Sequence, residues 1–250
     1  MPNPLHLAQL SELEQAKLAA LAEFAAGAGH EINNPLAAIL GRSQLLLRGE
    51  TDPERRRALA AIGGQAIRIK EMIGDLMLFA RPPQPKLELL DLANIVTSTV
   101  SKFADQIREQ GITCSIQVNL PHDLRINADG TQTAIVVSEL LRNAIHAASP
   151  NGWIDLLVEK ISGSESPAEN LGHDQSFIAL TMDNSGPPLS ETARAHLFDP
   201  FFSGRDAGRG LGFGLCKVWR ILQQHGGWVA VDSNATLTSF TVAWPINTSD

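Results

Sequence analysis

A histidine with polar neighbours near the amino terminus is the first group of residues that can do chemistry. Glu31 follows His30 directly, and Asn34 and Pro35 come four and five positions after the histidine. A neighbouring carboxylate can accept or orient one imidazole proton and leave the other ring nitrogen nucleophilic near neutral pH. Asn34 lies one helical turn from His30 and shares its face, whereas Pro35 removes an amide and predicts a bend. This pattern indicates a reactive histidine, and the alternative is a surface histidine of a coiled coil.

A second polar group falls on one face of a predicted helix over residues 131–148. Glu139, Asn143 and His146 are spaced by four and three positions, with apolar residues behind them. An asparagine oxygen suits Mg²⁺, which takes few protein ligands and keeps several waters. We therefore expect Asn143, with Glu139, to hold Mg²⁺ beside a phosphate-bearing ligand that His146 also contacts. The alternative is a solvated helix face.

A third group ends a predicted strand and contains Asp183, Asn184 and Gly186. A glycine at a strand end lets a ligand approach the backbone closely. A carboxylate or amide oxygen there can accept a hydrogen bond from an exocyclic amine such as that of adenine. Taken alone this pattern is weak, because a glycine-proline turn after a strand is common.

A run of alternating glycines leads directly into a predicted helix over residues 212–224. The predicted phosphate-binding residues of this run are Gly210, Gly212, Gly214 and Leu215. Unblocked amides and a helix amino terminus converge there, which favours phosphate binding over a merely flexible loop. Between this run and the strand end lie Phe198, Arg205 and Arg209, which we interpret as a mobile lid with phosphate-binding arginines. The alternative places the phenylalanines in the core and the arginines in solvent.

Two long helices must position the histidine. The first is predicted over residues 5–47, and the second starts with Thr51 as its cap, followed by Pro53 and Glu54. Apolar residues spaced alternately by three and four predict a coiled-coil seam on each helix and an antiparallel hairpin. The seam of the first helix is Leu18, Leu21, Ala25, Ala28, Ile32, Pro35, Ile39 and Leu46; that of the second is Leu59, Ile62, Ala66, Ile69, Ile73, Leu76 and Ala80. One hairpin leaves a seam half covered, so we expect two copies to form a four-helix bundle.

A proline-rich segment divides the chain. We place a helical hairpin at residues 1–81, a stiff linker at 82–86 and a second domain at 87–250. Strands are predicted at 86–90, 112–118, 124–127, 153–161, 177–182, 228–232 and 238–244, with helices in between. Strands in one layer and helices in another predict a two-layer α/β sandwich. The fold class is therefore multi-domain, a hairpin followed by a sandwich.

Composition limits the functions that remain. A formal net charge of -7 argues against nucleic acid as the main partner. The two cysteines, Cys114 and Cys216, match no metal spacing and are typical of a reducing compartment. The chain has no apolar run long enough to span a membrane and no signal peptide after Met1. We therefore expect a cytoplasmic location.

Taken in order, the motifs resemble those of the sensor histidine kinases of two-component signalling, over residues 18 to 246. Residues 30–36 resemble the phospho-acceptor box, 139–143 the asparagine box, 183–186 the first glycine box, 198–202 the phenylalanine box and 210–215 the second glycine box. The resemblance implies a dimerisation and phosphotransfer hairpin followed by an ATP-binding domain of the type shared with gyrase and heat-shock chaperones. It also implies that His30 attacks the γ-phosphoryl group of ATP with Mg²⁺ bound and Glu31 as base. The phosphoryl group would then pass to an aspartate on a response-regulator receiver domain, and Asn34 would orient water for dephosphorylating that regulator.

Two positions depart from the family pattern. Many of these kinases have asparagine where this chain has Glu139, a residue type that activates water in the related ATPases. Asn184 stands where the family has its adenine-reading aspartate, with Asp183 one position earlier, so either can read adenine. Two other functions therefore remain open. One is an ATPase that hydrolyses ATP through Glu139, and the other is a dimeric scaffold that binds no nucleotide.

Overall fold

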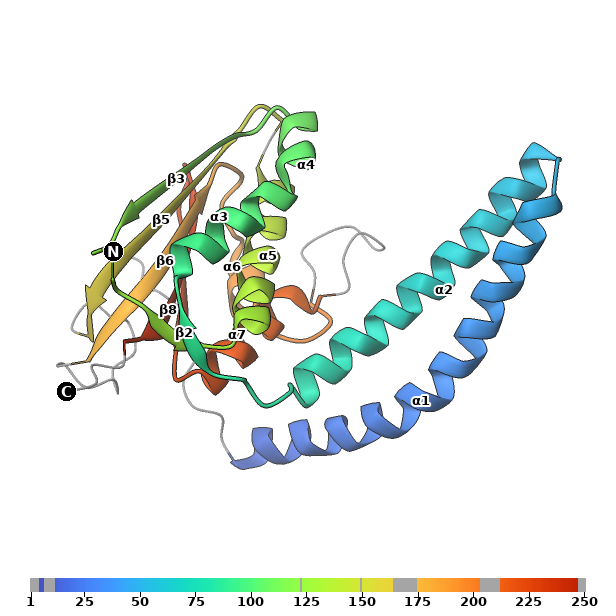
Figure 1. The fold of residues 1–250 in the computed structure, drawn as a ribbon, viewed down its shortest axis with the longest axis horizontal. Helices are drawn as coiled ribbons and strands as arrows, with labels where there is room; N and C mark the ends of the chain where they lie inside the picture. Colours follow the sequence, from blue (N-terminus) through green and yellow to red (C-terminus); the bar gives the residue numbers. More distant parts are fainter. Residues whose placement is uncertain are drawn as a thin grey trace. The chain divides into compact units, whose positions relative to one another are not determined.

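The computed structural model describes residues 5–6, 12–121, 123–148, 150–163, 175–202 and 212–246. The chain forms two compact units. One unit runs from Leu10 to Pro83, and the other runs from Gln84 onward and includes the short strand Leu5–His6. Figure 1 shows the first unit as a pair of long helices and the second as a sheet with helices on it. None of the helices in the described ranges combines the length and hydropathy that crossing a bilayer requires.

The first unit is a hairpin of α1 (Glu12–Gly49) and α2 (Pro53–Ala80). Asp52 caps α2, because its carboxylate accepts hydrogen bonds from the amides of Glu54 and Arg55, both at 2.9 Å. The prediction that Thr51 is the cap is therefore wrong by one residue. Arg56 donates from Nη1 to the carbonyls of Leu47 and Glu50, and so closes the free end of α1.

Small residues bring the two helices of the hairpin together. Among the residues of α1 whose side chains are described, the buried ones are Gly29, Leu36 and Ser43; those on α2 are Gly63, Ala66, Leu76, Phe79 and Ala80. A Cβ at Gly63 would lie only 2.8 Å from the Ser43 hydroxyl. The antiparallel hairpin is confirmed, and so is the α2 seam at Ala66, Leu76 and Ala80. Pro35, Ile39 and Leu46 of the predicted α1 seam are exposed, as are Ile62 and Ile69 of the α2 seam, so a single hairpin leaves the seam partly uncovered, as the sequence predicts. The side chains of Leu18, Leu21, Ala25 and Ala28 lie outside the described part of the structure.

The second unit contains, among its described residues, a six-stranded sheet in the order β1-β7-β8-β6-β5-β3. Its strands are β1 (Leu5–His6), β3 (Thr113–Asn119), β5 (Trp153–Ser162), β6 (Ser176–Asn184), β7 (Trp228–Ser233) and β8 (Thr238–Pro245). Adjacent strands are antiparallel except for the parallel pair β3 and β5. A separate two-stranded sheet pairs β2 (Glu88–Leu90) with β4 (Ile126–Ala128). Leu5 and His6 pair with β7, so the prediction that the first helix begins at Leu5 is wrong.

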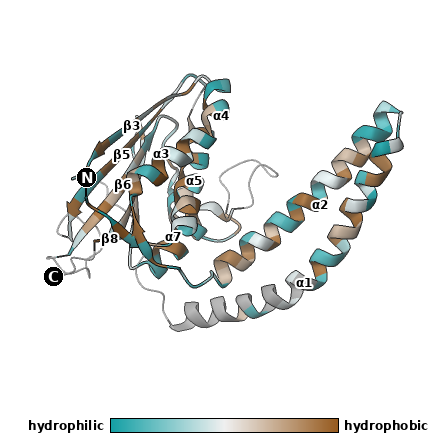
Figure 2. Cartoon of the chain, viewed as in Figure 1, coloured by the Kyte–Doolittle hydropathy of each residue, from teal (hydrophilic) through white to brown (hydrophobic). Residues whose placement is uncertain are grey.

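Helices cover one face of this sheet (Figure 1). They are α3 (Leu92–Lys102), α4 (Ala104–Glu109), α5 (Gly130–Ala147), α6 (Glu191–His196) and α7 (Gly214–Gln224). On the covered face β5 presents Ile154, Leu156 and Val158, each at most 1% exposed. Figure 2 shows hydrophobic residues, in brown, on strands of the sheet and on the helices that cover it. The predicted fold class, a helical hairpin followed by a two-layer α/β sandwich, is confirmed.

Candidate active site

The reactive-histidine motif lies on α1 where this helix packs tightly on α2. The backbone of His30 is helical, whereas its side chain is outside the described part of the structure. A Cβ at the preceding Gly29 would lie 3.0 Å from Met77 Sδ, so α1 and α2 are in close contact at this level. Glu31 and Asn34 are both exposed. Their side chains are therefore available to a group that approaches from solvent.

Pro35 lies inside α1 without ending it. Figure 1 shows that α1 is curved rather than straight, which agrees with the predicted effect of a missing amide in a helix interior.

The Glu139 carboxylate, on α5, is buried and has a cation at each oxygen. Glu139 is 8% exposed. Its Oε1 lies 2.7 Å from Lys217 Nζ on α7, and its Oε2 lies 3.1 Å from Arg142 Nη1 on its own helix. Both oxygens of this carboxylate are thus paired with protein cations. Among the described residues, no cluster of three or more His, Cys, Asp or Glu side chains could hold a metal.

Asn143 and His146 follow Glu139 along the same helix. Asn143 is half-buried, one turn after Glu139. His146 is exposed, and its Nδ1 lies 2.5 Å from the carbonyl oxygen of Arg142. Because a carbonyl only accepts, Nδ1 carries the proton in this contact. His146 therefore presents only its Nε2 to a ligand.

Asp183 and Asn184, at the end of β6, lie on opposite faces of the sheet. Asn184 pairs in register with Ile154 of β5, so it shares the helix-covered face with that buried residue. It is 2% exposed, and its Nδ2 donates to the Ser185 carbonyl at 3.0 Å. Asp183 pairs with Asp155, which is exposed, and so it belongs to the opposite face. Of the two candidate adenine readers, Asn184 is the one that faces the helical layer.

Gly186 brings the turn after β6 against the end of α5. Its φ is 154°, and a Cβ at this position would lie 2.5 Å from the carbonyl oxygen of Ala147. Only glycine allows this approach of two backbones. The turn with Asn184 is thereby held next to the last turn of α5, which carries Asn143 and His146.

The glycine run and the phenylalanine segment are also in direct contact. Gly212 has a φ of 72°, and a Cβ there would lie 2.4 Å from the carbonyl carbon of Phe201. Phe201 packs edge-on against Phe213 with a centroid distance of 4.7 Å. Gly214 then begins α7, and a Cβ there would lie 3.0 Å from Glu139 Oε2. The start of α7 therefore lies directly against α5.

The predicted lid is described only in part. Phe198 is buried, whereas Phe201 is 60% exposed and has a positive φ of 66°. Arg205, Arg209 and Gly210 lie outside the described residues. Leu215 is buried in the first turn of α7. The lid itself stays a prediction.

Asp129 fixes the start of α5. Its carboxylate accepts hydrogen bonds from the amides of Gln132 at 2.9 Å and Lys86 at 2.8 Å. Its own amide donates to Nε2 of His225, whose Nδ1 contacts the Ile221 carbonyl at 2.8 Å. Burial acts to raise the pKa of Asp129, but the backbone hydrogen bonds outweigh it and the pKa is lowered. Through its carboxylate and its amide, Asp129 thus joins the linker end, the start of α5 and the end of α7.

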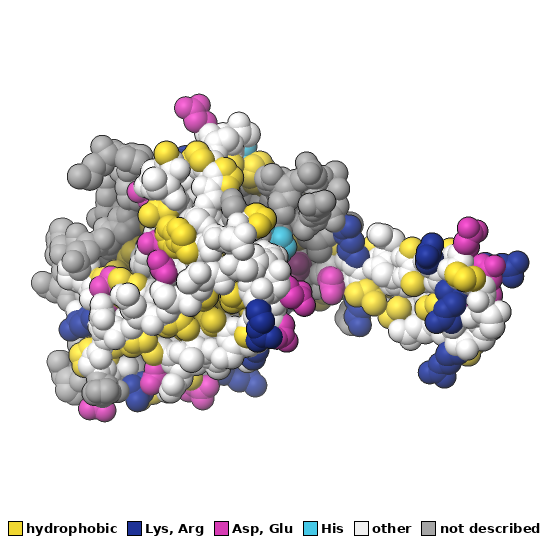
Figure 3. Space-filling model, turned by 90° about the horizontal axis from the view of Figure 1, so that it is seen from above, with side chains coloured by type: hydrophobic (Ala, Val, Ile, Leu, Met, Phe, Trp, Pro, Cys, Tyr) yellow, Lys and Arg dark blue, Asp and Glu magenta, His cyan; other side chains and the backbone are white. Residues whose placement is uncertain are grey.

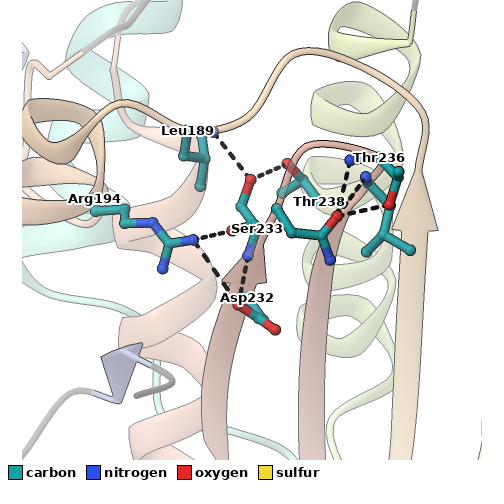
Figure 4. Close-up of polar contacts among 8 residues, drawn as sticks. Leu189, Arg194, Asp232, Ser233, Thr236 and Thr238 are labelled. Carbon is teal, nitrogen blue, oxygen red and sulfur yellow. Dashed lines mark hydrogen bonds and ion pairs between the residues drawn. The ribbon is translucent and has the colours of Figure 1, made fainter. Parts of the chain in front are cut away.

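A polar network also fixes the segment that follows the β6 turn (Figure 4). The Leu189 amide donates to Ser233 Oγ at 3.0 Å, and this hydroxyl lies 2.8 Å from Thr238 Oγ1. Arg194 of α6 donates to the Ser233 carbonyl and lies 3.9 Å from Asp232 Oδ1. The chain between the β6 turn and the phenylalanine segment is therefore anchored to the β7–β8 hairpin.

Two predicted motifs thus converge on α5: the turn after β6 at its end, and the last glycine of the glycine run, which begins α7, at its middle. Sequence reasoning missed Lys217 and Arg142, the two partners of Glu139. The Glu139–Arg142 spacing of three is a recognisable ion-pair signal on a helix. A lysine inside the apolar run of α7 signals a buried, paired charge. The fold and these contacts define a two-layer α/β sandwich with a polar site on α5, joined to a helical hairpin whose first helix carries His30.

Comparison with known proteins agrees with this definition. Residues 20–85 match the His Kinase A (phospho-acceptor) domain, and residues 128–248 match the histidine kinase-, DNA gyrase B- and HSP90-like ATPase family. The sensor histidine kinase ZraS of Klebsiella oxytoca is 27% identical over 96% of this chain and 49% of its own length. The chain belongs to the sensor histidine kinases of two-component signalling. It spans half or less of the length of the curated relatives it matches.

Two solved structures share the fold. Full-length ShkA in complex with AMPPNP has a TM-score of 0.74 and 23% identity, over 90% of this chain and 46% of ShkA. Histidine kinase ThkA in complex with the response regulator protein TrrA has a TM-score of 0.64 and 23% identity, over 94% of this chain and 65% of the matched chain. Both likenesses support the two-domain architecture described above.

Proposed function

We propose that this chain binds ATP with Mg²⁺, phosphorylates its own His30 and passes the phosphoryl group to an aspartate of a response regulator. The observation that carries the proposal is the convergence of the β6 turn and the start of α7 on α5, in a chain whose hairpin carries His30. The two family matches cover these same two parts. The domain limits expected from the sequence are a hairpin at 1–81, a linker at 82–86 and a catalytic domain at 87–250. Because Leu5–His6 pairs with β7 and the hairpin unit runs from Leu10 to Pro83, we propose that the first residues of the chain belong with the catalytic domain. The cytoplasm, where ATP is available, is the compartment in which this reaction would take place.

Nucleotide recognition would use three elements of the catalytic domain. Asn184 faces the helical layer and would read the adenine amine with its side-chain oxygen, because its Nδ2 is already bonded to Ser185. The amides at Gly210, Gly212 and Gly214, together with the amino terminus of α7, would hold phosphate oxygens. His146, Phe198, Arg205, Arg209 and Leu215 complete the proposed pocket.

Mg²⁺ would bind at Asn143 rather than at Glu139, because both oxygens of Glu139 already contact cations. Asn143 offers one side-chain oxygen, and Mg²⁺ usually keeps several waters and binds substrate phosphates in addition to one or two protein ligands. Glu139 offers no oxygen without a cation partner. When bound, Mg²⁺ would neutralise part of the phosphate charge, and the remaining catalysis would come from positioning.

The chemical step would be in-line displacement. A ring nitrogen of His30 forms a bond to the γ-phosphorus, the bond from this phosphorus to the bridging oxygen breaks, and ADP leaves. Glu31 follows His30 directly and is exposed, which suits a base that takes the imidazole proton. Because acceptor and nucleotide site belong to different units, the linker at 82–86 must allow one unit to reach the other.

A homodimer would cover the apolar surface that one hairpin leaves exposed. The exposed large apolar residues of the hairpin are Ile39, Leu45, Leu46, Ile62, Ile67 and Ile69. Ile39 and Leu46 belong to the predicted seam of α1, and Ile62 and Ile69 to that of α2. Figure 3 shows hydrophobic side chains among Lys and Arg on the visible surface of the hairpin. A second copy would bury this seam in a four-helix bundle.

The response regulator is proposed as the second partner. The fold of the chain is that of ThkA, whose structure was solved with the regulator TrrA. Asn34 is exposed one turn after His30 and would orient water when the regulator is dephosphorylated.

Incubation with γ-labelled ATP and Mg²⁺ tests the proposal. The unchanged chain should acquire an acid-labile, alkali-stable label, and His30→Gln should acquire none while still binding ATP. His6→Gln, in the other unit, is the matched control and should be labelled normally. Retention of histidine-type label on His30→Gln would refute the assignment.

A further inference from the structure

A buried ion pair connects the two helices that flank the proposed phosphate site. Lys217 of α7 is 5% exposed and Glu139 of α5 is 8% exposed, and their charged atoms lie 2.7 Å apart. Burying two charges is costly, and removal of either partner leaves the other charge uncompensated. The pair therefore fixes the position of the Glu139 side chain strongly.

The same carboxylate is also restrained on its other oxygen. Arg142 Nη1 lies 3.1 Å from Oε2, and the Gly214 backbone packs against that atom. A carboxylate that activates water needs an oxygen directed at the water. In this chain each oxygen of Glu139 is directed at a cation instead.

We infer that Lys217 is a positioning residue that holds Glu139 away from water, so that the phosphoryl group of ATP goes to His30 rather than to solvent. This inference rests on the proposed function, and it assigns to Lys217 the choice between phosphoryl transfer and hydrolysis. It also explains how a glutamate at this helix position is compatible with a kinase.

The reaction that the ion pair suppresses is ordinary ATP hydrolysis. A water oxygen forms a bond to the γ-phosphorus, the bond from phosphorus to the bridging oxygen breaks, and ADP leaves. One proton of the water passes to a carboxylate and from there to solvent. Lys217 opposes the proton transfer, because a proton arriving at Oε1 would displace the ammonium group bonded to it.

The test measures phosphate release in the full chain carrying His30→Gln, so that no phosphohistidine contributes. Adding Lys217→Met should raise the kcat of release by about 100-fold, the lower end of what a general base typically supplies, with little change in KM for ATP. Adding Glu139→Gln to this variant should abolish the rise. Lys160→Met removes an exposed lysine of β5 and serves as the matched control with unchanged release.

Three outcomes would overturn the inference. The first is an unchanged rate of phosphate release in a Lys217→Met variant that folds and binds ATP. The second is a raised rate that persists when Glu139→Gln is added. The third is fast release that depends on Glu139 while Lys217 is intact. If Lys217→Met does not fold, Lys217→Gln replaces it under the same criteria, because its neutral amide keeps a polar partner in the core but no longer opposes a proton on Oε1 with a positive charge. Labelling of His30 in the unchanged chain is measured separately, so failure of the kinase proposal is distinguishable from failure of this one.

Discussion

Replacement of Gly212 by alanine should damage the proposed phosphate site in a way that the structure lets us quantify. Gly212 has a φ of 72°, a region that costs an L-residue about 1–2 kcal/mol. The added Cβ would also lie 2.4 Å from the carbonyl carbon of Phe201 and 2.6 Å from the carbonyl oxygen of Phe202. These are backbone atoms, so relief requires movement of the turn at an added cost of about 1–3 kcal/mol.

Together these costs predict a loss of about 2–5 kcal/mol of stability in the catalytic domain. Calorimetry should show the Tm of this domain lowered by at least about 4 °C. Autophosphorylation should fall by about 100-fold, because a displacement of about 1 Å near the reacting groups carries that cost. Gly130→Ala is the matched control, because its Cβ would meet no atom closer than 3.4 Å and φ there is not positive. An unchanged Tm and unchanged labelling in Gly212→Ala would refute this reasoning.

Three further predictions follow from other contacts. Asp129→Asn should lower stability at neutral pH by about 1–2 kcal/mol through loss of charged hydrogen bonds. Because the folded pKa of Asp129 is lowered, its contribution is present above the ordinary aspartate range and is lost as pH falls through the folded value. The free energies of unfolding of the unchanged chain and of Asp129→Asn, measured in urea, should therefore become equal at acid pH. A difference that persists there would contradict this role of Asp129. Asn184→Leu should abolish ATP binding in calorimetric titration whereas Asp183→Asn keeps it, and the reverse result would move adenine recognition to Asp183. Ile39→Glu should halve the mass measured by light scattering, with Val118→Glu as control; a mass unchanged by Ile39→Glu argues against the bundle.

The parts of the fold that have regular apolar spacing or a distinct run of glycines were predictable from the sequence. Heptad spacing predicts both long helices, and the glycines at 210, 212 and 214 predict the approach to α7. Short-range competition explains one error and long-range strand pairing explains another. Asp52 replaces Thr51 as cap because its carboxylate reaches two amides. Leu5 and His6 form a strand because β7 offers an edge to pair with, a long-range effect that no local pattern reveals.

The candidate site was predictable as a set of motifs but not as a set of contacts. Strand parity alone does not tell which of Asp183 and Asn184 faces the helices, because the register with β5 decides it. The pairing of Glu139 with Lys217 joins residues 78 positions apart, and only the packing of α5 on α7 brings them together. Sequence spacing thus located the polar residues, whereas tertiary packing determined which of them remain available to a ligand.

The most direct test of the central claim is to locate the phosphoryl group after incubation with ATP and Mg²⁺. Peptide mass spectrometry at alkaline pH on the unchanged chain and on Asn143→Asp makes this comparison. The account predicts a phosphoryl group on the peptide containing His30 in the unchanged chain and its loss in Asn143→Asp. A phosphoryl group on another residue, or undiminished His30 phosphorylation in Asn143→Asp, would contradict it.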